Sequence, residues 1–336
     1  MIKSLQSLRG IFAIIIVIYH YYSRSTAVVN ATACGVSFFF MMSGFALSMH
    51  HEVRTLKGFG YGRFLRNRFA KFYPLHLVLT LAMIYFYGIN WKLWANVFLV
   101  QSWYTEMDVW FSYNGTSWFV ASLAFCYLFY ALFSYWSHRL KPAVSLAILG
   151  GIIVAMTTFY FFLPSDVAIW FYYVFPPARL VPFGLGIVLA RLCKDDVMRG
   201  SASRWVWLAL VMLVVVLTII LWPQTEVIPR VYFLSLVWYV PLAVLIVALC
   251  KAEQKGSLVT RVLSWKPLVW LGDISFEIYM WQVLVSLIVG KLAVLVIGHQ
   301  FVSEVYIAVI LVLVIPVAWL THRYFTTPLA HCLRAR

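Results

Sequence analysis

Ten apolar stretches, each close to the length that a membrane-crossing helix needs, constrain this chain more than any other feature. We place them at residues 8–23, 34–50, 69–89, 117–137, 143–162, 176–193, 204–222, 231–250, 268–290 and 301–321. A spanning helix takes about 20 predominantly apolar residues, and in lipid a helix satisfies its own backbone polar groups. Of all residues, 64% are hydrophobic and 11% charged. We therefore expect an all-α, polytopic membrane bundle of about ten helices.

The Lys and Arg residues are divided unevenly between the two sides of this bundle. With the N-terminus on the cytoplasmic side, 20 of the 26 fall in or beside the cytoplasmic segments and five on the outer side. Basic residues concentrate in the cytoplasmic loops of membrane proteins. The net charge of +15 therefore indicates topology and a lipid bilayer as partner, with both termini cytoplasmic and no nucleic acid bound.

The remaining composition predicts a single membrane domain over residues 1–336, with no appended soluble domain. The five cysteines are scattered without a CxxC motif or ligand spacing, so we expect neither a disulfide framework nor a metal site. Residues 90–116 hold four tryptophans and predict an interfacial segment on the outer surface. Asn30 and Asn114 each begin an N-glycosylation pattern on that side. The sequence does not specify an oligomeric state.

The first span carries an arginine and a histidine in an apolar run. Arg9 and His20 are eleven residues apart, which brings them about 20° past three full turns and so onto one helix face. They lie roughly 16 Å apart along the axis, with Arg9 near one surface and His20 beyond the midplane. By itself this pattern fits two interpretations. Arg9 is either a topogenic anchor or a functional group, and His20 is either a partner of a neighbouring helix or a reactive base.

Other polar residues lie within the predicted spans, where ionisable groups are costly and tend to mark function. They are His76 in the third span, Arg179 at the start of the sixth, Asp273, Glu277 and Gln282 in the ninth, and Glu304 in the tenth. Asp273 and Glu277 are four residues apart and are expected to share a helix face. We interpret Asp273 as a boundary residue and Glu277, about one turn deeper, as part of a polar seam with Ser43, His76, Arg179 and Gln282.

Several stretches, taken together, resemble the type 3 family of integral membrane acyltransferases. Arg9 and His20, separated by ten residues in SLRGIFAIIIVIYH, match the arginine and histidine of that family's first span. VSFFFMMSGFALS resembles its aromatic run followed by Ser-Gly-Phe, here with Ser43. PPARLVPFGLGIVLARL matches its arginine and glycine pattern, with Arg179 and Gly186. LGDISFEIYMWQVLV resembles its Gly-x-Ile-Ser-aromatic stretch.

A basic stretch adds to the resemblance, and three departures accompany it. YGRFLRNRFAKFYPLH corresponds to the family's basic segment, in which the matching residues are Arg63, Arg66, Arg68, Lys71 and Pro74. The chain differs from many members at Leu123, where they have a carboxylate, and at Gln282, where they have a histidine. It also has Thr326 and Thr327 before Pro328, where they often have a glutamate. The resemblance covers essentially the whole chain.

The resemblance implies an O-acyltransferase of a bacterial inner or plasma membrane. It implies acyl-CoA as the donor substrate, with acetyl as the expected group, and no bound cofactor. Arg9 and the basic residues would hold the CoA phosphates, since guanidinium groups match phosphate geometry. His20 would act as the base, or as a transient acyl carrier, toward a hydroxyl of a cell-surface or exported glycan or related acceptor.

Two other classes of protein remain as alternatives at this point. A transporter or flippase would use His20 and Glu277 as a proton relay and the polar seam as a solute path. Such a fold predicts two pseudo-symmetric half-chains, and we find no internal repeat in the sequence. A non-catalytic membrane partner or receptor is the other alternative, and it predicts that His20 is dispensable.

Overall fold

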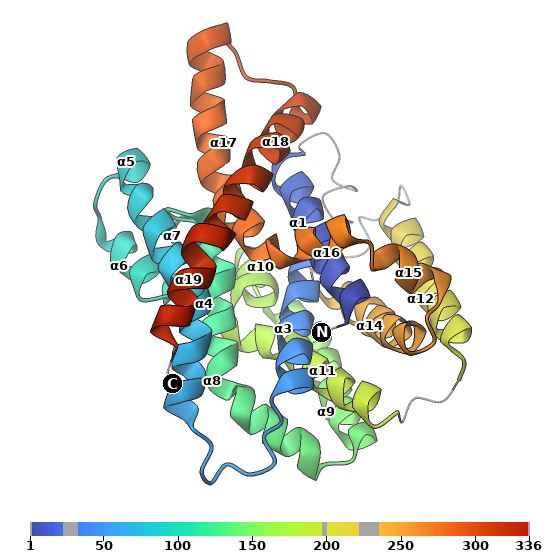
Figure 1. The fold of residues 1–336 in the computed structure, drawn as a ribbon. Helices are drawn as coiled ribbons and strands as arrows, with labels where there is room; N and C mark the ends of the chain where they lie inside the picture. The colour runs from blue at the N-terminus through green and yellow to red at the C-terminus, as the bar shows by residue number, and fades with distance from the viewer. Residues whose placement is uncertain (1, 23–32, 197–199, 222–234, 335–336) are drawn as a thin grey trace.

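The computed structural model describes residues 2–22, 33–196, 200–221 and 235–334, and the regular elements in this part of the chain are all helical (Figure 1). Within it, nine helical segments have the length and apolar composition to cross a membrane. The bundle is built from α1 (Lys3–Tyr21), α3 (Cys34–His50), α4 (Tyr61–Ala82), α8 (Trp118–Arg139), α9 (Pro142–Phe159), α11 (Pro176–Lys194), α12 (Ala202–Leu221), α14 (Tyr239–Gln254), α17 (Ser275–Ile297) and α18 (Ser303–Thr321). The predicted fold class is confirmed.

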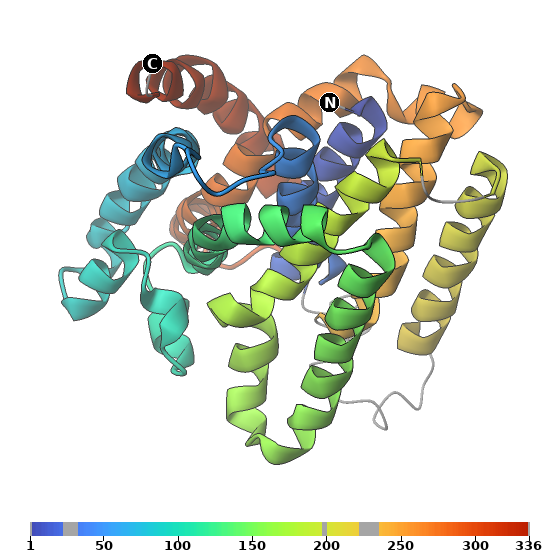
Figure 2. The ribbon, with the colours of Figure 1, turned by 90° about the horizontal axis from the view of Figure 1, so that it is seen from below.

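The interior of the bundle is formed by α3 and α11. α3 has only 17 residues, about 26 Å of helix at 1.5 Å per residue, and 13 of its residues are buried. In contrast, only 17% of the apolar windows of α9 and α12 is buried. Figure 2 shows α12 at one edge of the molecule. These two peripheral helices therefore turn most of their apolar surface toward lipid.

Two glycines let α3 and α11 approach each other closely. A Cβ added to Gly186 would lie 1.9 Å from the Met41 carbonyl oxygen, and one added to Gly44 would lie 2.1 Å from that of Phe183. Contacts this short exclude any side chain. Membrane helices associate through small residues at their interfaces. The Ser-Gly-Phe pattern and Gly186 therefore form one packing contact between the two helices.

The predicted ninth span, 268–290, is wrong as a single helix. The chain breaks at Ile274, between α16 (Lys266–Asp273) and α17, and α17 extends to Ile297. A Cβ on Gly272 would lie 1.9 Å from the Gln6 carbonyl oxygen, so α16 packs directly against the start of α1. Asp273 and Glu277 consequently belong to different helices. They do not share the helix face that the four-residue spacing predicted.

The boundaries of two other predicted segments also differ. The basic stretch, expected as a loop up to residue 68, is helical from Tyr61 and forms the first turns of α4. Apolar residues such as Phe64, Phe72 and Leu75 are buried on this helix, and their packing holds it together where hydropathy alone predicts a loop. The eighth span is observed as Tyr239–Gln254, and its predicted start at residue 231 lies outside the described residues.

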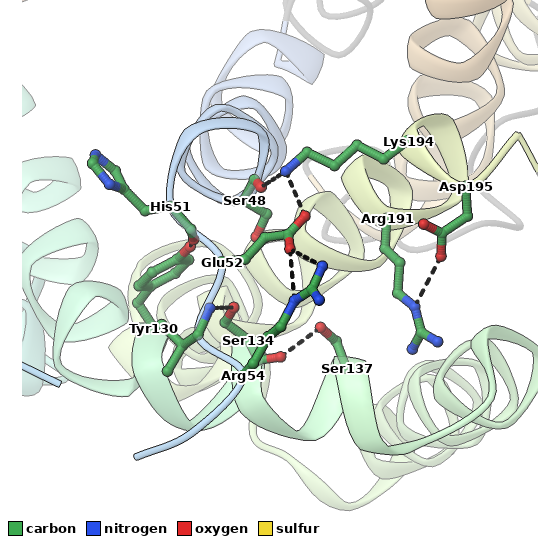
Figure 3. Close-up of polar contacts among 11 residues, drawn as sticks. Ser48, His51, Glu52, Arg54, Tyr130, Ser134, Ser137, Arg191, Lys194 and Asp195 are labelled. Carbon is green, nitrogen blue, oxygen red and sulfur yellow. Dashed lines mark hydrogen bonds and ion pairs between the residues drawn. The ribbon is translucent and has the colours of Figure 1, made fainter. Parts of the chain in front are cut away.

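Basic residues gather where α3, α8, α11 and α14 end, and we call this the basic end of the bundle. The Lys194 ammonium donates to the Ser48 carbonyl at 2.8 Å and pairs with Glu52 at 2.7 Å. Glu52 also binds Arg54 at 2.9 Å (Figure 3). Arg191 donates to the Leu140 carbonyl at 2.6 Å. These contacts tie the ends of α3, α8 and α11 together.

The opposite end carries the tryptophan-rich segment as short helices that include α6 (Trp91–Val97) and α7 (Met107–Trp110). Trp91, Trp94 and Trp103 are exposed there, whereas Trp110 is buried. Asn114 is also fully buried and donates to the Met280 carbonyl at 3.1 Å. This contact binds the segment to α17, and burial excludes Asn114 as a glycosylation acceptor in the folded chain. Asn30 lies outside the described residues.

Candidate functional site

A pocket of about 360 Å³ lies among α1, α4 and α17, near the basic end. Its wall is completed by the C-terminal segment, in which a π-turn, η7 (His322–Thr326), leads from α18 into α19 (Thr327–Leu333). Figure 1 shows α19 lying along α4. The basic side chains that line the pocket are Arg9, Arg68, Lys71 and Arg334, and the carboxylates are Asp273 and Glu277. The pocket therefore carries more positive than negative charge.

The Arg9 guanidinium is held by a short polar chain at the start of α1. Its Nη1 donates to Gln6 Oε1 at 3.2 Å, and Gln6 Nε2 donates to Asp273 Oδ1 at 2.7 Å. All three residues line the pocket. Gln6 thus orients the guanidinium without neutralising it, which leaves donors of Arg9 free for an anion. Guanidinium groups bind phosphates through such paired N–H donors.

The four basic residues predicted for donor binding separate into two pairs. Arg68 and Lys71 line the pocket, but Arg63 and Arg66 do not. Within each pair the two residues are three apart and share a helix face. The two pairs lie on different faces of α4, and the face of Arg63 and Arg66 turns toward solvent. Both Arg63 and Arg66 are exposed, and Arg66 Nε donates to the Leu333 carbonyl at 2.8 Å. Arg66 therefore fastens α19 against α4.

A carboxylate and a histidine pair inside the pocket. His322 Nδ1 lies 3.0 Å from Glu277 Oε1, and the Glu277 side chain is only 2% exposed. The pair joins the first turn of α17 to the π-turn after α18. π-turns inside helices frequently mark functional sites. Ser43, predicted as part of the polar seam, lines the same pocket and donates to the Phe39 carbonyl at 2.8 Å.

Aromatic rings form the inner end of the pocket. Phe39, Phe119 and Tyr279 all line it, and their rings meet edge to face. The Phe119 centroid lies 6.2 Å from that of Phe39 and 5.2 Å from that of Tyr279. The Tyr279 hydroxyl donates to the Thr116 carbonyl at 2.9 Å. The pocket is thus polar toward the basic end and aromatic toward the bilayer midplane.

His20 lies beyond this aromatic end and is paired with Gln282. His20 Nδ1 is 3.2 Å from Gln282 Oε1, while Gln282 Nε2 donates to the Tyr279 carbonyl at 3.0 Å. The carbonyl acceptor fixes the amide orientation, so Oε1 faces the imidazole. A neutral His20 must then carry its proton on Nδ1. Its Nε2 lone pair is therefore available as a base.

Two residues predicted for the polar seam lie elsewhere. His76 is fully buried, and its Nε2 lies 2.9 Å from the Asn96 carbonyl oxygen, so it joins α4 to α6. Arg179 is also fully buried and donates to the Tyr172 and Tyr173 carbonyls at 2.6 and 2.8 Å. Its guanidinium lies over the Tyr173 ring, 5.2 Å from the centroid. Neither residue lines the pocket.

Sequence reasoning missed several residues that the structure brings to the site: Gln6, Tyr279, His322 and Arg334. Gln6 lies three residues before Arg9, ahead of the predicted first span at 8–23, and the earlier start of α1 at Lys3 places it on the helix. His322 and Arg334 lie at the C-terminal end, where basic residues were interpreted as topology. Nothing local to the sequence indicates that this end folds back against α4. Among the described residues, no cluster of three or more His, Cys, Asp or Glu side chains is placed to hold a metal ion.

Comparison with known proteins decides the family. Residues 2–323 match the acyltransferase domain family, Acyl_transf_3. The chain belongs to this acyltransferase family. It is also 32% identical over 285 residues to the acyltransferase MdmB of Streptomyces mycarofaciens, an alignment that covers 76% of this chain and 69% of that protein. No solved structure matches the chain.

Membership in the acyltransferase family confirms the resemblance seen in the sequence motifs. The protein is a membrane-bound acyltransferase, and its reaction requires an acyl donor and an acceptor. The family also favours the enzyme over a transporter. In agreement, the proposed relay residues have different partners, because His20 binds Gln282 and Glu277 binds His322.

Proposed function

We propose that this acyltransferase moves an acyl group, with acetyl as the expected one, from cytosolic acyl-CoA to a hydroxyl of a glycan or related acceptor. The observation that supports this most directly is the pocket itself. It has four basic side chains near the basic end and aromatic rings at its inner end. A CoA thioester has the matching order of groups, with charged phosphates at one end and a slender arm leading to the thioester.

The donor would enter from the basic end, which the distribution of Lys and Arg assigns to the cytoplasm. Arg9, Arg68, Lys71 and Arg334 would hold the phosphates, since charge-assisted hydrogen bonds are stronger than neutral ones. The arm would extend past Phe39, Phe119 and Tyr279 toward His20. Gln282 lies three residues after Tyr279 on α17, roughly 4.5 Å further along the helix, so the thioester approaches the His20–Gln282 pair.

His20 would act as the general base through Nε2. The acceptor hydroxyl gives its proton to Nε2 as its oxygen attacks the thioester carbonyl carbon. The carbon–sulfur bond then breaks, and the departing CoA thiolate takes the proton from the imidazolium. The ester and CoA thiol are the products, and the histidine returns to its neutral form. Gln282 holds the imidazole in the required tautomer throughout.

The test uses purified protein in lipid nanodiscs with acetyl-CoA, monitored by thiol release in the presence of envelope glycans. Replacing His20 by Ala is expected to lower turnover by about 10²–10⁴-fold, the usual contribution of a general base. His76→Asn is the matched control, since His76 is buried away from the pocket, and it should retain the wild-type rate per folded molecule. Wild-type turnover by a folded His20→Ala protein would remove His20 from the mechanism.

The acceptor is identified in a separate experiment. Mass spectrometry of cell-surface glycans from cells with and without the gene should show an acetyl ester that depends on the protein. A glycan fraction that is unchanged in the absence of the gene would contradict a glycan acceptor. Thiol release by the purified protein would still support the enzyme in that case.

A further inference from the structure

Three buried polar atoms that have no hydrogen-bond partner among the described residues belong to side chains of the pocket. They are Arg68 Nε, Thr326 Oγ1 and Glu277 Oε2. Buried polar groups without partners are rare in folded proteins because each one costs its desolvation free energy. Arg68 Nε is a donor, Glu277 Oε2 is an acceptor, and the Thr326 hydroxyl can act as either. Their convergence on one pocket indicates a ligand that supplies both kinds of partner.

Glu277 determines which groups of a ligand can bind beside it in the pocket. One carboxylate oxygen binds His322 at 3.0 Å, and the other has no partner. Glu277 lies five residues before Gln282 on α17, which places it roughly 7.5 Å nearer the basic end than Gln282. A buried carboxylate there repels a phosphate and accepts an N–H or O–H. The phosphates are therefore confined to the basic mouth of the pocket.

We infer that Glu277 Oε2 accepts a hydrogen bond from an amide N–H of the pantetheine arm of the donor, and that Thr326 Oγ1 donates to an amide carbonyl of the same arm. An amide presents one donor and one acceptor, which complements the unpartnered atoms. This subsite fixes how far the arm enters and so where the thioester stops relative to His20. The inference rests on acyl-CoA being the donor, as proposed above.

The Glu277–His322 pair also ties α17 to the C-terminal segment, so the experiment must separate recognition from structure. The probes are CoA, pantetheine, which has the arm alone, and the phosphorylated ADP half of CoA, which lacks the arm. Dissociation constants are measured by titration calorimetry in nanodiscs. Arg334 lies on the same segment as His322, so a variant that displaced this segment would weaken binding of the nucleotide half as well.

Glu277→Gln keeps the shape of the side chain. His322 holds the amide oxygen, which turns the –NH₂ group toward the pocket where an acceptor was. We expect CoA and pantetheine to bind about 10–100-fold more weakly, the range for a hydrogen bond to a charged group, with the nucleotide half unchanged. Thr326→Val removes the free hydroxyl without touching the Glu277–His322 pair. It is expected to weaken the binding of CoA and pantetheine by about threefold to tenfold.

If Glu277→Gln weakened the binding of all three probes equally, the Glu277–His322 pair would have a structural role only, and the inference would be overturned. Unchanged binding of pantetheine by both variants would overturn it as well. If Glu277→Gln does not fold, Thr326→Val alone decides between these outcomes. Failure of the wild-type protein to bind CoA would instead refute the proposed donor, and that result is distinguishable because it appears before any substitution is made.

Discussion

At the scale of single residues, the site is organised by amide side chains that orient charged or reactive neighbours. Gln6 links Arg9 to Asp273, and Gln282 links His20 to the Tyr279 backbone. Neither amide adds a charge to the low-dielectric interior, where an isolated charge is costly. Each amide fixes the orientation of the side chain beside it. The Arg9 guanidinium and the His20 imidazole are thus positioned by hydrogen bonds whose direction is set by a backbone carbonyl or a carboxylate.

Replacing Gln282 by Leu tests the role of this orientation. The leucine keeps the approximate volume but removes the acceptor for the His20 Nδ1 proton, so the imidazole loses its preferred tautomer and ring position. We expect kcat to fall by about tenfold, the equivalent of one hydrogen bond, while CoA binding is unchanged. Steady-state kinetics with acetyl-CoA separates the two parameters. An unchanged kcat would mean that His20 is oriented by something else.

Replacing Arg9 by Lys tests donor binding at the mouth of the pocket. Lysine keeps the charge but has neither the planar fork nor the geometry of the bond to Gln6 at 3.2 Å. We expect CoA to bind about tenfold more weakly, and the topology to be unchanged because a basic residue still marks this end. A variant with wild-type affinity for CoA would support an anchor role for Arg9.

At the scale of helices, two features position the site. One is the glycine contact between α3 and α11, and the other is the break between α16 and α17. The first brings the Phe39 and Ser43 helix into the centre of the bundle. The second lets α16 pack on α1 through Gly272 while α17 starts anew at Ser275. Glu277 therefore faces the pocket, Gln282 contacts His20, and both residues lie on α17.

Replacing Gly186 by Ala tests the first contact. The added methyl group would meet the Met41 carbonyl at 1.9 Å, so α3 and α11 must separate. We expect a loss of about 1–3 kcal/mol in the free energy of unfolding, as for other overpacked interiors. Gly150→Ala on α9 is the control, because its Cβ would have no atom within 4 Å. Thermal unfolding in detergent compares the two, and equal melting temperatures would contradict the close contact.

The ends of α3 and α11 are joined by Glu52, and this contact depends on pH. The Lys194 ammonium, assisted by Arg54, lowers the pKa of Glu52 to about 2. A lowered pKa stabilises the fold above the ordinary glutamate value near 4.3. That contribution is lost as the pH falls toward 2. Glu52→Gln should therefore flatten the acid limb of stability between about pH 4.5 and 2, as measured by thermal unfolding. An identical acid limb would show that the pair contributes nothing.

At the scale of the whole molecule, the two ends of the bundle differ in chemistry. The ion pairs of Glu52 and the pocket mouth lie at the basic end. The opposite end has exposed aromatic residues such as Trp91, Trp94 and Phe98, together with the Lys92–Asp108 ion pair. Such aromatic residues are typical of a membrane interface. This polarity supports a reaction in which the donor enters from one side and His20 is reached from the other.

Cysteine labelling tests this sidedness in intact cells. Cys332 is exposed, and the other four cysteines are buried, so a Cys332→Ser background suits the experiment. A cysteine at Lys57, which is exposed near the basic end, should resist an impermeant thiol reagent. A cysteine at Thr105, which is exposed at the aromatic end, should react. The reverse pattern would invert the topology and with it the cytosolic entry of the donor.

The sequence by itself determined the helical membrane class, the basic side of the bundle and the common face of Arg9 and His20. Hydropathy, charge bias and helical periodicity are local properties, so each can be read from consecutive residues. Only the tertiary structure decided which side chains contact one another. It paired His20 with Gln282, paired Glu277 with His322, and brought Arg334 to the pocket. These contacts join residues 45 or more positions apart, and which helices become neighbours depends on packing across the whole bundle.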